Sequence, residues 1–328
     1  MIVLPGTEKV VKHPNTVTND VLVSICVQTY NHEKYIERCL NGILNQQTSF
    51  LFEILLGEDN SRDNTRSICL EYAEKYPDKI RLFLHSRDNV INIGGAPTGR
   101  YNLLYNLSNA NGEFIAFCEG DDFWNDPEKL QRQVDFLRNN PAYSFTFHPI
   151  YSINETTQNM TKSFRGEKGG KTYETKDFIL DFPASFLSLV IRNHLVALPE
   201  WFKQVYGGDI FLMMLLSAHG KAYCHQEYMG VYNVHAGGLT GQWAKNNLFK
   251  ETKQVIKGLD FFNEYTRKRY QKTVKKRKEK QILKYQYSNA EGNFHKIRLD
   301  FIITFCYSQI NYSTIRAFIV RGIRYFLK

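Results

Sequence analysis

The sequence predicts an α/β protein whose mostly parallel, Rossmann-like sheet is flanked by helices. Short apolar runs alternate with helical patterns along the first half of the chain, which is the order of βα units. Three of these runs end in polar or acidic segments, and open α/β sheets bind ligands at the carboxyl ends of their strands. With 328 residues, the chain can hold one large domain of this class and an appendage.

The predicted elements follow one another at ordinary spacing. Strands are expected over 21–27, 52–56, 80–84 and 114–118, and helices after residue 36, near 99–110 and over 210–217. The first helix is indicated by Ile36, Leu40 and Ile43, which fall on one helical face with Leu44. A Gly-rich loop is expected at 92–97. Strands that alternate with helices in this way favour a parallel sheet.

The most informative segment is Glu119-Gly120-Asp121-Asp122, which directly follows the fourth predicted strand. Its three carboxylates repel one another, and nothing in the local sequence neutralises them. A bound Mg²⁺ or Mn²⁺ ion would do so, because hard cations take oxygen ligands. The alternative is a solvated acidic turn before the helix that Pro127 opens.

These motifs together resemble the family-2 glycosyltransferases, which have the GT-A fold. The resemblance rests on Thr29-Tyr30-Asn31, on Glu58-Asp59-Asn60-Ser61-Arg62-Asp63 and on Glu119 to Trp124. Gly208–Leu212 and Tyr228–Gly238 resemble the acceptor-side part of the same family. The similarity covers roughly residues 21–240. It implies an inverting hexosyltransferase of the kind that builds bacterial surface polysaccharides or lipid-linked saccharides.

The resemblance also implies a domain organisation. Residues 1–242 would form the catalytic domain, with a nucleotide half at about 20–125 and an acceptor half at about 126–242. Residues 243–328 are predicted to form a basic helical region.

Several residues acquire expected roles through the resemblance. Contacts to the nucleotide-sugar donor, expected to be a UDP-sugar, are assigned to Thr29, Tyr30, Glu33, Asp59, Arg100, Glu119 and Asp121. Asp59 would accept a hydrogen bond from the base, and Glu119 would lie near the ribose. The residues themselves allow simpler roles, because Asp59 could cap a helix and Arg100 could form a surface salt bridge.

The remaining assignments concern the metal, the acceptor and the chemistry. Asp122 is expected to contact Mn²⁺ or Mg²⁺ directly, with Asp121 and His235 beside it. Asp209 would be the general base that deprotonates the acceptor hydroxyl, and Trp124 would face the acceptor sugar. The alternatives are a helix cap for Asp209, a structural histidine at 235 and a core position for Trp124. The family often has Arg where this chain has Asn233, so a phosphate contact there is missing or supplied elsewhere.

Other classes of function fit the motifs less well. A sugar nucleotidyltransferase should carry a Gly-rich phosphate loop with Arg and Lys after the first strand, where this chain has Gln28 to Glu33. A dinucleotide-dependent dehydrogenase would need Gly-x-Gly-x-x-Gly at that place. A non-catalytic nucleotide- or sugar-binding relative would have lost its carboxylates, whereas Asp121, Asp122 and Asp209 are present.

The positive charge is concentrated in the last part of the chain. Residues 241–328 contain 20 Lys and Arg and 6 Asp and Glu, which gives them a net charge of +14. The whole chain has a net charge of +9, so residues 1–240 have a net charge of −5. Within 313–328, apolar and basic residues fall on opposite helical faces, a pattern typical of a helix in a membrane interface. This segment is expected to dock on anionic membrane, or else to pack on the catalytic domain or on a second subunit in a homo-oligomer. Nucleic-acid binding by the basic run is not expected, since no nucleic-acid module surrounds it.

Cysteine usage and hydropathy indicate the cellular compartment in which the protein is expected. The six cysteines lack metal-site spacing and are expected to be reduced, buried thiols. There is no signal-peptide pattern, and no apolar run approaches 18 residues. The expected location is therefore the cytoplasm, with peripheral attachment to the inner face of the plasma membrane.

Overall fold

The computed structural model describes residues 4, 6–164, 169–237 and 248–290, and these form two compact units. The first unit spans 1–246 and the second spans 247–328. The predicted amphipathic segment at 313–328 lies outside the described residues.

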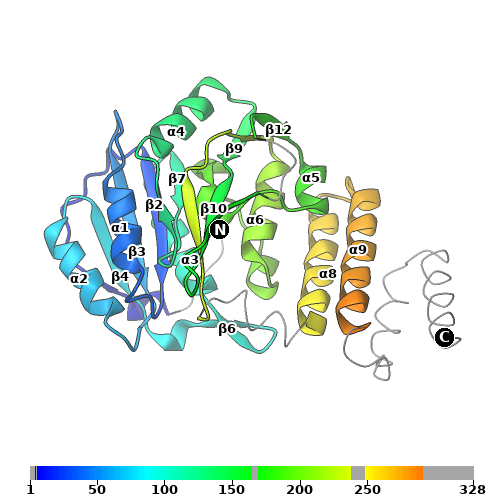
Figure 1. Cartoon of the computed structure of the whole chain (residues 1–328), viewed down its shortest axis with the longest axis horizontal. Helices are drawn as coiled ribbons and strands as arrows, with labels where there is room; N and C mark the ends of the chain where they lie inside the picture. The colour runs from blue at the N-terminus through cyan, green and yellow to red at the C-terminus, as the bar shows by residue number, and fades with distance from the viewer. Residues whose placement is uncertain (1–3, 5, 165–168, 238–247, 291–328) are drawn as a thin grey trace, which may run out of the picture. The chain divides into compact units, whose positions relative to one another are not determined.

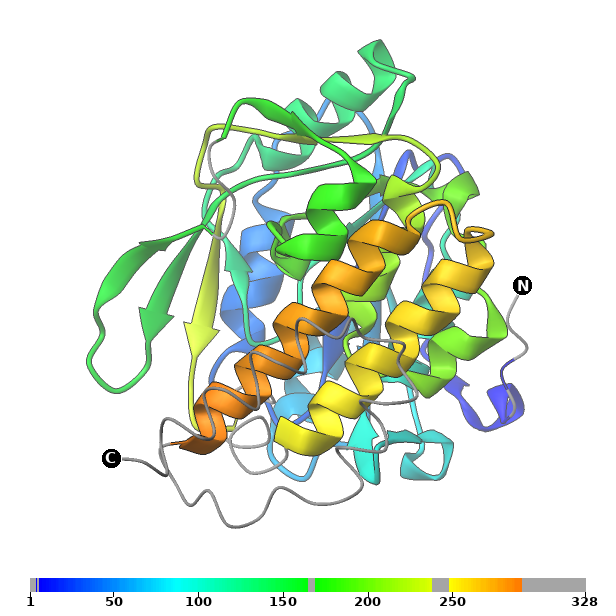
Figure 2. The same ribbon diagram turned by 90° about the vertical axis from the view of Figure 1, so that its right-hand side faces the viewer.

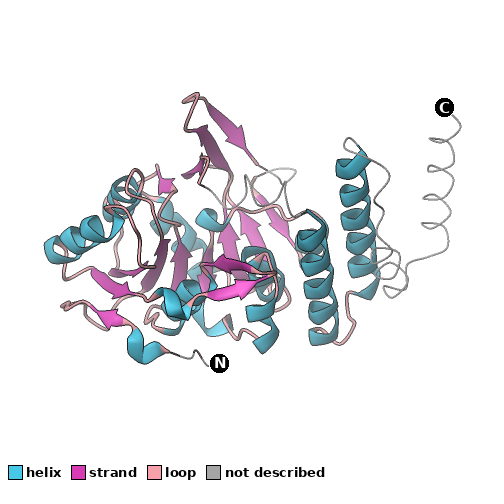
Figure 3. Ribbon diagram, turned by 90° about the horizontal axis from the view of Figure 1, so that it is seen from below, coloured by secondary structure: helices cyan, strands magenta, loops and turns pink. Residues whose placement is uncertain are grey.

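The first unit is built on a large mixed sheet, as Figures 1 and 3 show. In the described part of the chain its strand order is β1-β4-β3-β2-β7-β13-β9-β14-β12. Strands β4, β3, β2, β7, β9 and β14 run in one direction, and β1, β13 and β12 run in the other. The predicted mostly parallel α/β fold is therefore confirmed. The strands are β1 Val11–Lys12, β2 Val23–Thr29, β3 Phe52–Glu58, β4 Ile80–Leu84, β7 Phe114–Phe117, β9 Tyr143–Phe147, β12 Lys171–Tyr173, β13 Val190–Arg192 and β14 Lys221–Cys224.

Helices cover this sheet because its central strands are apolar on both faces. Every residue of β3 and β7 is buried, which is the burial pattern of a parallel strand between two layers. Helix α2 packs on β3 and β4, α3 on β2 and β3, and α6 on β9. The helices are α1 Ile36–Leu44, α2 Thr65–Lys75, α3 Arg100–Ser108, α4 Lys129–Asn139, α5 Thr175–Leu180 and α6 Gly208–Ser217. Short 3-10 turns occur at η1 Thr7–Lys9, η2 Arg87–Asn89, η3 Phe186–Ser188, η4 Asn193–Leu195 and η5 Glu200–Gln204.

The Gly-rich segment predicted as a loop is a small hairpin instead. Strands β5 Ile91–Ile93 and β6 Ala96–Thr98 pair across Gly94 and Gly95. These two glycines have φ angles of 63° and 84°, in the left-handed region that a two-residue hairpin turn requires. The glycines thus make a tight turn between two paired strands.

A second sheet joins distant parts of the chain beside the carboxyl ends of the central strands. Its order is β11-β10-β15-β8, formed by β11 Met160–Ser163, β10 Ile150–Asn154, β15 Gly230–Val234 and β8 Phe123–Trp124. Gly230 pairs with Trp124, and Val231 pairs with Phe123. This pairing brings the residues after β15 next to the acidic segment that precedes β8.

A lysine is buried beneath this second sheet. Lys129 is fully buried at the start of α4, and its Nζ lies 4.0 Å from the centre of the Trp124 ring. Among the described residues this Nζ has no hydrogen-bond partner. Burial lowers the pKa of Lys129 to about 7, although Cys118 and Asp126 act in the opposite direction. The folded protein therefore disfavours the charged form of this amine.

We expect Lys129→Met to raise the melting temperature below pH 7. The folded pKa of about 7 lies below the unfolded value, so the cost of the buried charge is fully present below pH 7 and disappears toward pH 10. Because each unit of pKa corresponds to about 1.4 kcal/mol, the fall of the pKa from 10.5 to about 7 predicts a gain on the order of 5 kcal/mol at pH 6. Thermal unfolding of both proteins at pH 6 and pH 9 measures this gain in stability.

Lys75→Met is the matched control, because Lys75 is an exposed lysine beside Tyr76. A lower melting temperature for Lys129→Met at pH 6 would show that the contact with Trp124 outweighs desolvation.

The second unit is a helical hairpin within its described residues. Helices α8 Leu248–Tyr265 and α9 Gln271–Ala290 lie side by side in Figure 2. Lys278 of α9 pairs with Asp260 of α8, and the apolar residues Leu259, Phe262 and Val274 are buried. The described residues of this unit are helical over 248–265 and 271–290, with a turn at 266–270 between the two helices. None of the described helices combines the length and the apolar character that a membrane span requires.

Candidate functional site

Two loops at the carboxyl ends of β2 and β3 are tied together by hydrogen bonds. The amide of Asp59 donates to the carbonyl of Thr29 over 3.0 Å, and the amide of Asn31 donates to Ser61 Oγ over 2.9 Å. Asn31 and Asn60 both have φ angles near 55–59°, which asparagine tolerates better than most residues. The predicted donor-site residues of these two loops therefore lie on neighbouring strand ends.

Asp59 forms a cluster with Tyr30 and with Arg87, which follows β4. Asp59 is 6% exposed, and Arg87 Nη1 donates to its Oδ2 over 2.7 Å. The Arg87 guanidinium also lies over the Tyr30 ring, 4.3 Å from its centre. Burial raises the pKa of Asp59 to about 6, against the opposing effect of Arg87. This cluster combines a carboxylate acceptor with an aromatic face, which are the groups that a planar base requires.

Thr29 and Glu33 have partners within the same loops. Thr29 is buried, and its Oγ1 lies 3.3 Å from His32 Nδ1. Glu33 Oε2 accepts a hydrogen bond from the amide of Asn64 over 3.0 Å, just before α2 begins. Glu33 thus links the two loops, and its assignment to the donor site remains a prediction.

Two histidines flank the Asp121 carboxylate. Asp121 Oδ2 lies 3.1 Å from His235 Nε2 and 3.7 Å from His32 Nε2. Burial alone would raise the pKa of Asp121, but the hydrogen bond to His235 and the charges of His32 and His235 hold it below its usual value. Asp121 therefore stays ionised, and it is held by residues that are 89 and 114 positions away in the chain.

Asn233 holds Asp122 and the main chain of the acidic turn, which is formed by residues 119–122. The amide of Asn233 donates to Asp122 Oδ1 over 2.9 Å, and its Nδ2 donates to the carbonyl of Asp121 over 2.7 Å. Asp122 is 2% exposed, and its other oxygen, Oδ2, has no partner among the described residues. Burial, together with the charges of Asp121 and Glu119, raises the pKa of Asp122 well above its usual value. A buried carboxylate oxygen without a partner is costly unless a ligand binds it.

Glu119 is the first residue of the acidic turn. Burial raises its pKa to about 8, and the charges of Asp121 and Asp209 add to the effect. The structure thus brings the predicted general base close to the predicted donor residues. Glu119 is largely protonated at neutral pH, so its hydroxyl can donate a hydrogen bond.

The start of α6 explains how Asp209 reaches this place. The N-cap residue is Gly207, with a φ of 77°, so Asp209 lies inside the first turn and is not the cap. The buried Arg100 guanidinium donates to the carbonyls of Phe202 and Val205, just before α6. A Cβ atom at Gly208 would lie 2.3 Å from Arg100 Nη2, so only glycine permits this approach. Arg100 is therefore buried and does not form the surface salt bridge that the sequence allowed. A contact between Arg100 and the nucleotide remains a prediction.

The expectation that Trp124 faces the acceptor is corrected by the structure. Trp124 is 3% exposed, and its Nε1 donates to the carbonyl of Leu187 over 3.0 Å. The ring packs against Lys129 in the core. Trp124 itself lies in β8, and burial of its large ring in the core stabilises the fold.

The side chains of the acidic turn fit a divalent cation whose coordination shell is completed by the phosphates of the substrate. Asp121 Oδ2 and His235 Nε2 are adjacent, and Asp122 carries the unpartnered oxygen. In the described ranges, no three His, Cys, Asp or Glu side chains gather as a complete metal centre. This arrangement is what Mg²⁺ and Mn²⁺ use with nucleotides, because they take one or two carboxylates together with substrate phosphates.

Three residues of this site were missed by sequence reasoning. His32 directly follows the first motif, Thr29-Tyr30-Asn31, and its position at a strand end was the available signal. Arg87 follows β4 in the same way. The role of Asn233 in holding the acidic turn depends on the pairing of β8 with β15, which the sequence does not reveal.

Comparison with protein families gives a direct match. The model described as Glycosyl transferase family 2 matches residues 24–193, which is just over half of the chain. The matched range contains Asp59 and the acidic turn, and it ends before Asp209 and His235.

Curated relatives are similar over different parts of the chain. An uncharacterised protein of Mycobacterium tuberculosis is 41% identical over 133 residues, which are 40% of this chain and 36% of that protein. The chain thus matches little more than a third of the length of this relative. The GalNAc(5)-diNAcBac-PP-undecaprenol beta-1,3-glucosyltransferase of Campylobacter jejuni is 28% identical over 233 residues, 70% of each chain.

Solved structures share the fold at low identity. S. aureus TarS 1-349 in complex with UDP-GlcNAc has a TM-score of 0.59 and 18% identity, over 85% of this chain and 77% of that one. Mannosyltransferase PcManGT from Pyrobaculum calidifontis, in complex with GDP-Man and Mn²⁺, has a TM-score of 0.53 and 14% identity, over 96% and 84% of the two chains.

Proposed function

Because this chain belongs to glycosyl transferase family 2, we propose that it moves a sugar from a nucleotide-sugar donor to an acceptor hydroxyl by an inverting single displacement. The observation that carries the proposal is the convergence of three groups at one sheet edge. These are the Asp59 cluster, the acidic turn with its two histidines, and Asp209 at the start of α6. The family match favours sugar transfer over the sugar nucleotidyltransferase alternative, and the retained carboxylates argue against a non-catalytic relative.

The donor is proposed to be a UDP-sugar that lies across the ends of β3, β2 and β7. Asp59 accepts a hydrogen bond from the base, and Tyr30 stacks against it with Arg87 behind. Protonated Glu119 donates to the ribose. The TarS structures in complex with UDP and with UDP-GlcNAc support this choice of nucleotide.

The leaving diphosphate is placed at the acidic turn. Asp121, Asp122 and His235 would hold Mn²⁺ or Mg²⁺, which compensates the charge that the diphosphate gains as the glycosidic bond breaks. His32 keeps the Asp121 carboxylate ionised and oriented. Asn233 fixes the turn that carries both aspartates.

The acceptor hydroxyl is activated by Asp209. Its carboxylate takes the proton as the acceptor oxygen bonds to the anomeric carbon, and the bond to the diphosphate breaks on the opposite face. This displacement inverts the configuration. The Arg100 contacts with Phe202 and Val205 hold the turn that presents Asp209.

The acceptor is proposed to be a saccharide of the cell envelope, either free or linked to a lipid. The Campylobacter jejuni relative is named for an undecaprenol-linked acceptor, which supports this class. Attachment to the inner face of the plasma membrane through residues 313–328 remains part of the proposal. Association through those residues with a second copy of the chain is the alternative.

Thermal shift and product analysis test the proposed function. UDP-sugars with Mn²⁺ should raise the melting temperature more than UDP-sugars with chelator or Mn²⁺ alone. Proton NMR of the transferred sugar should then show inverted anomeric configuration. The absence of a shift for every nucleotide sugar, with or without Mn²⁺, would reject the proposed donor class.

Asp59→Ala should weaken UDP binding by about 10- to 100-fold. It removes a charged hydrogen-bond acceptor, and such hydrogen bonds contribute about 1.5–3 kcal/mol. Calorimetric titration with UDP and Mg²⁺ measures the loss. The control is Asp88→Ala, an exposed aspartate in the neighbouring turn η2. Equal affinities for the two variants would place the base elsewhere.

A further inference from the structure

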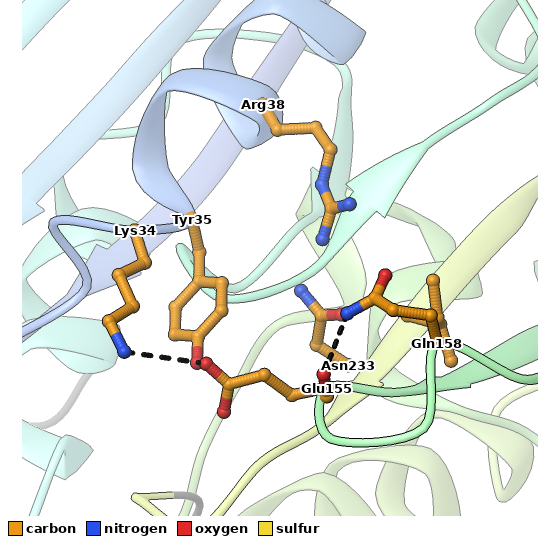
Figure 4. Close-up of a pocket in the computed structure, with 7 residues that line it drawn as sticks. Lys34, Tyr35, Arg38, Glu155, Gln158 and Asn233 are labelled. Carbon is orange, nitrogen blue, oxygen red and sulfur yellow. Dashed lines mark hydrogen bonds and ion pairs between the residues drawn. The ribbon is translucent and has the colours of Figure 1, made fainter.

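A small cavity lies beside the acidic turn, between the start of α1 and the hairpin of β10 and β11 (Figure 4). Its volume is about 260 Å³, a little below the range of about 300–1,000 Å³ that is typical of drug-sized ligands. It can therefore admit one sugar ring or one charged group. The lining residues are Lys34, Tyr35, Arg38, Ile153, Glu155, Gln158 and Asn233.

The cavity is next to the proposed reaction centre, and none of its lining residues is itself one of the predicted donor residues. Asn233 forms part of its wall and also holds Asp121 and Asp122. The Tyr35 ring lies 4.7 Å from the His235 ring. None of the lining residues belongs to the Asp59 cluster at the other end of the site. The hairpin of β10 and β11 lies in the part of the chain assigned to the acceptor.

The lining of the cavity has two cationic side chains, Lys34 and Arg38, and one carboxylate. The one carboxylate of the lining, Glu155, is already engaged by Lys34 Nζ at 3.6 Å and by a hydrogen bond from the Tyr35 hydroxyl. That hydrogen bond lowers the pKa of Glu155, so it remains ionised and satisfied.

Arg38 is the other cation of the lining, and at longer range the charge of Asp122 in the acidic turn favours its charged form. Its guanidinium packs on the Phe123 ring, 4.1 Å from the centre, and within the described ranges it forms no ion pair at 4.0 Å or less. In Figure 4 the guanidinium points toward the amides of Gln158 and Asn233. A guanidinium whose plane is held by an aromatic ring presents a fork of donors that matches phosphate or carboxylate.

We propose that this cavity is a subsite for a phosphate or carboxylate group of the acceptor saccharide, bound by Arg38 with Lys34 as the second cation. The inference rests on the proposed function, since it assigns the cavity to the acceptor. Gln158 and the Tyr35 ring supply the hydrogen-bonding and stacking groups that a sugar ring needs beside its charge. The enzyme would thus select charged acceptor saccharides over neutral ones.

Calorimetry with small probes tests the subsite without requiring the natural acceptor. The enzyme is first saturated with UDP and Mg²⁺, so that the donor site is occupied, and is then titrated at low ionic strength with glucose 6-phosphate, glucuronate or glucose. We expect both charged probes to bind at least about tenfold more tightly than glucose. Arg38→Gln should remove that preference while it leaves UDP affinity within about twofold. Arg38→Lys should retain part of it, because it keeps the charge but loses the fork.

Arg138→Gln is the matched control, since Arg138 is exposed on α4 and lies outside the cavity. Equal affinity of the wild-type enzyme for glucose and for both charged probes would overturn the subsite. So would an unchanged preference in Arg38→Gln. Displacement of UDP by the charged probes would instead assign the cavity to the donor diphosphate, which also overturns the inference. Since these readouts measure binding and not transfer, they remain decisive even if the proposed transferase activity fails its own test.

Discussion

Asp209→Asn is expected to lower the turnover number for sugar transfer by about 10²–10⁴-fold, the range that general-base catalysis contributes. Asparagine keeps the size of the side chain but cannot take the proton from the acceptor hydroxyl. UDP affinity should change by less than about twofold, because Asp209 acts on the acceptor. Transfer assays under donor saturation and calorimetry with UDP measure the two quantities separately.

The same substitution has a second readout. Asp209 contributes to the raised pKa of Glu119, which is about 8 and is caused first by burial. In Asp209→Asn this pKa should fall, so the pH dependence of UDP binding should shift to lower pH. Asp20→Asn, an exposed aspartate near the N-terminus, serves as the control. Transfer at the wild-type rate would place the base elsewhere, and retained configuration in the product would contradict the single displacement.

Much of the fold could be predicted because its signals are local. The four apolar runs became β2, β3, β4 and β7, and the apolar face of α1 is buried as its spacing indicates. The ends of parallel strands meet at one edge of the sheet, so the positions of Asp59 and the acidic turn followed from strand order alone. The short hairpin of β5 and β6 was missed, since a Gly-Gly pair signals a turn without showing that its flanks pair.

The parts of the site that escaped prediction depend on contacts between distant segments. Nothing near Arg100 indicates that its guanidinium will reach the carbonyls of Phe202 and Val205. Likewise, the sequence shows Asn233 only as a departure from the family pattern. Its contact with the acidic turn becomes visible only in the structure, where β15 pairs with β8. Trp124 was misplaced for the same reason, because the partner of its indole, the Leu187 carbonyl, is 63 positions away.

Asp121→Asn is expected to weaken Mn²⁺-dependent binding of UDP by at least about tenfold and to lower turnover with it. The substitution removes the charge that faces His32 and His235, and it leaves Asp122 as the remaining carboxylate ligand of the turn. Calorimetric titrations with UDP, in Mn²⁺ and in excess chelator, separate the metal-dependent part of the affinity. In chelator the variant and the wild-type enzyme should bind UDP equally well.

Asp122→Asn provides the complementary measurement. Its unpartnered Oδ2 is buried, whereas its Oδ1 accepts the Asn233 amide, so an amide in this position can keep the turn and still lose the metal-dependent affinity. If Asp122→Asn keeps that affinity and Asp121→Asn loses it, the cation is held by Asp121 and His235, and Asp122 is a structural residue. The Asp20→Asn enzyme again provides the reference. Full transfer activity of the wild-type enzyme in excess chelator would show that the two histidines, and not a metal, balance the charge of Asp121.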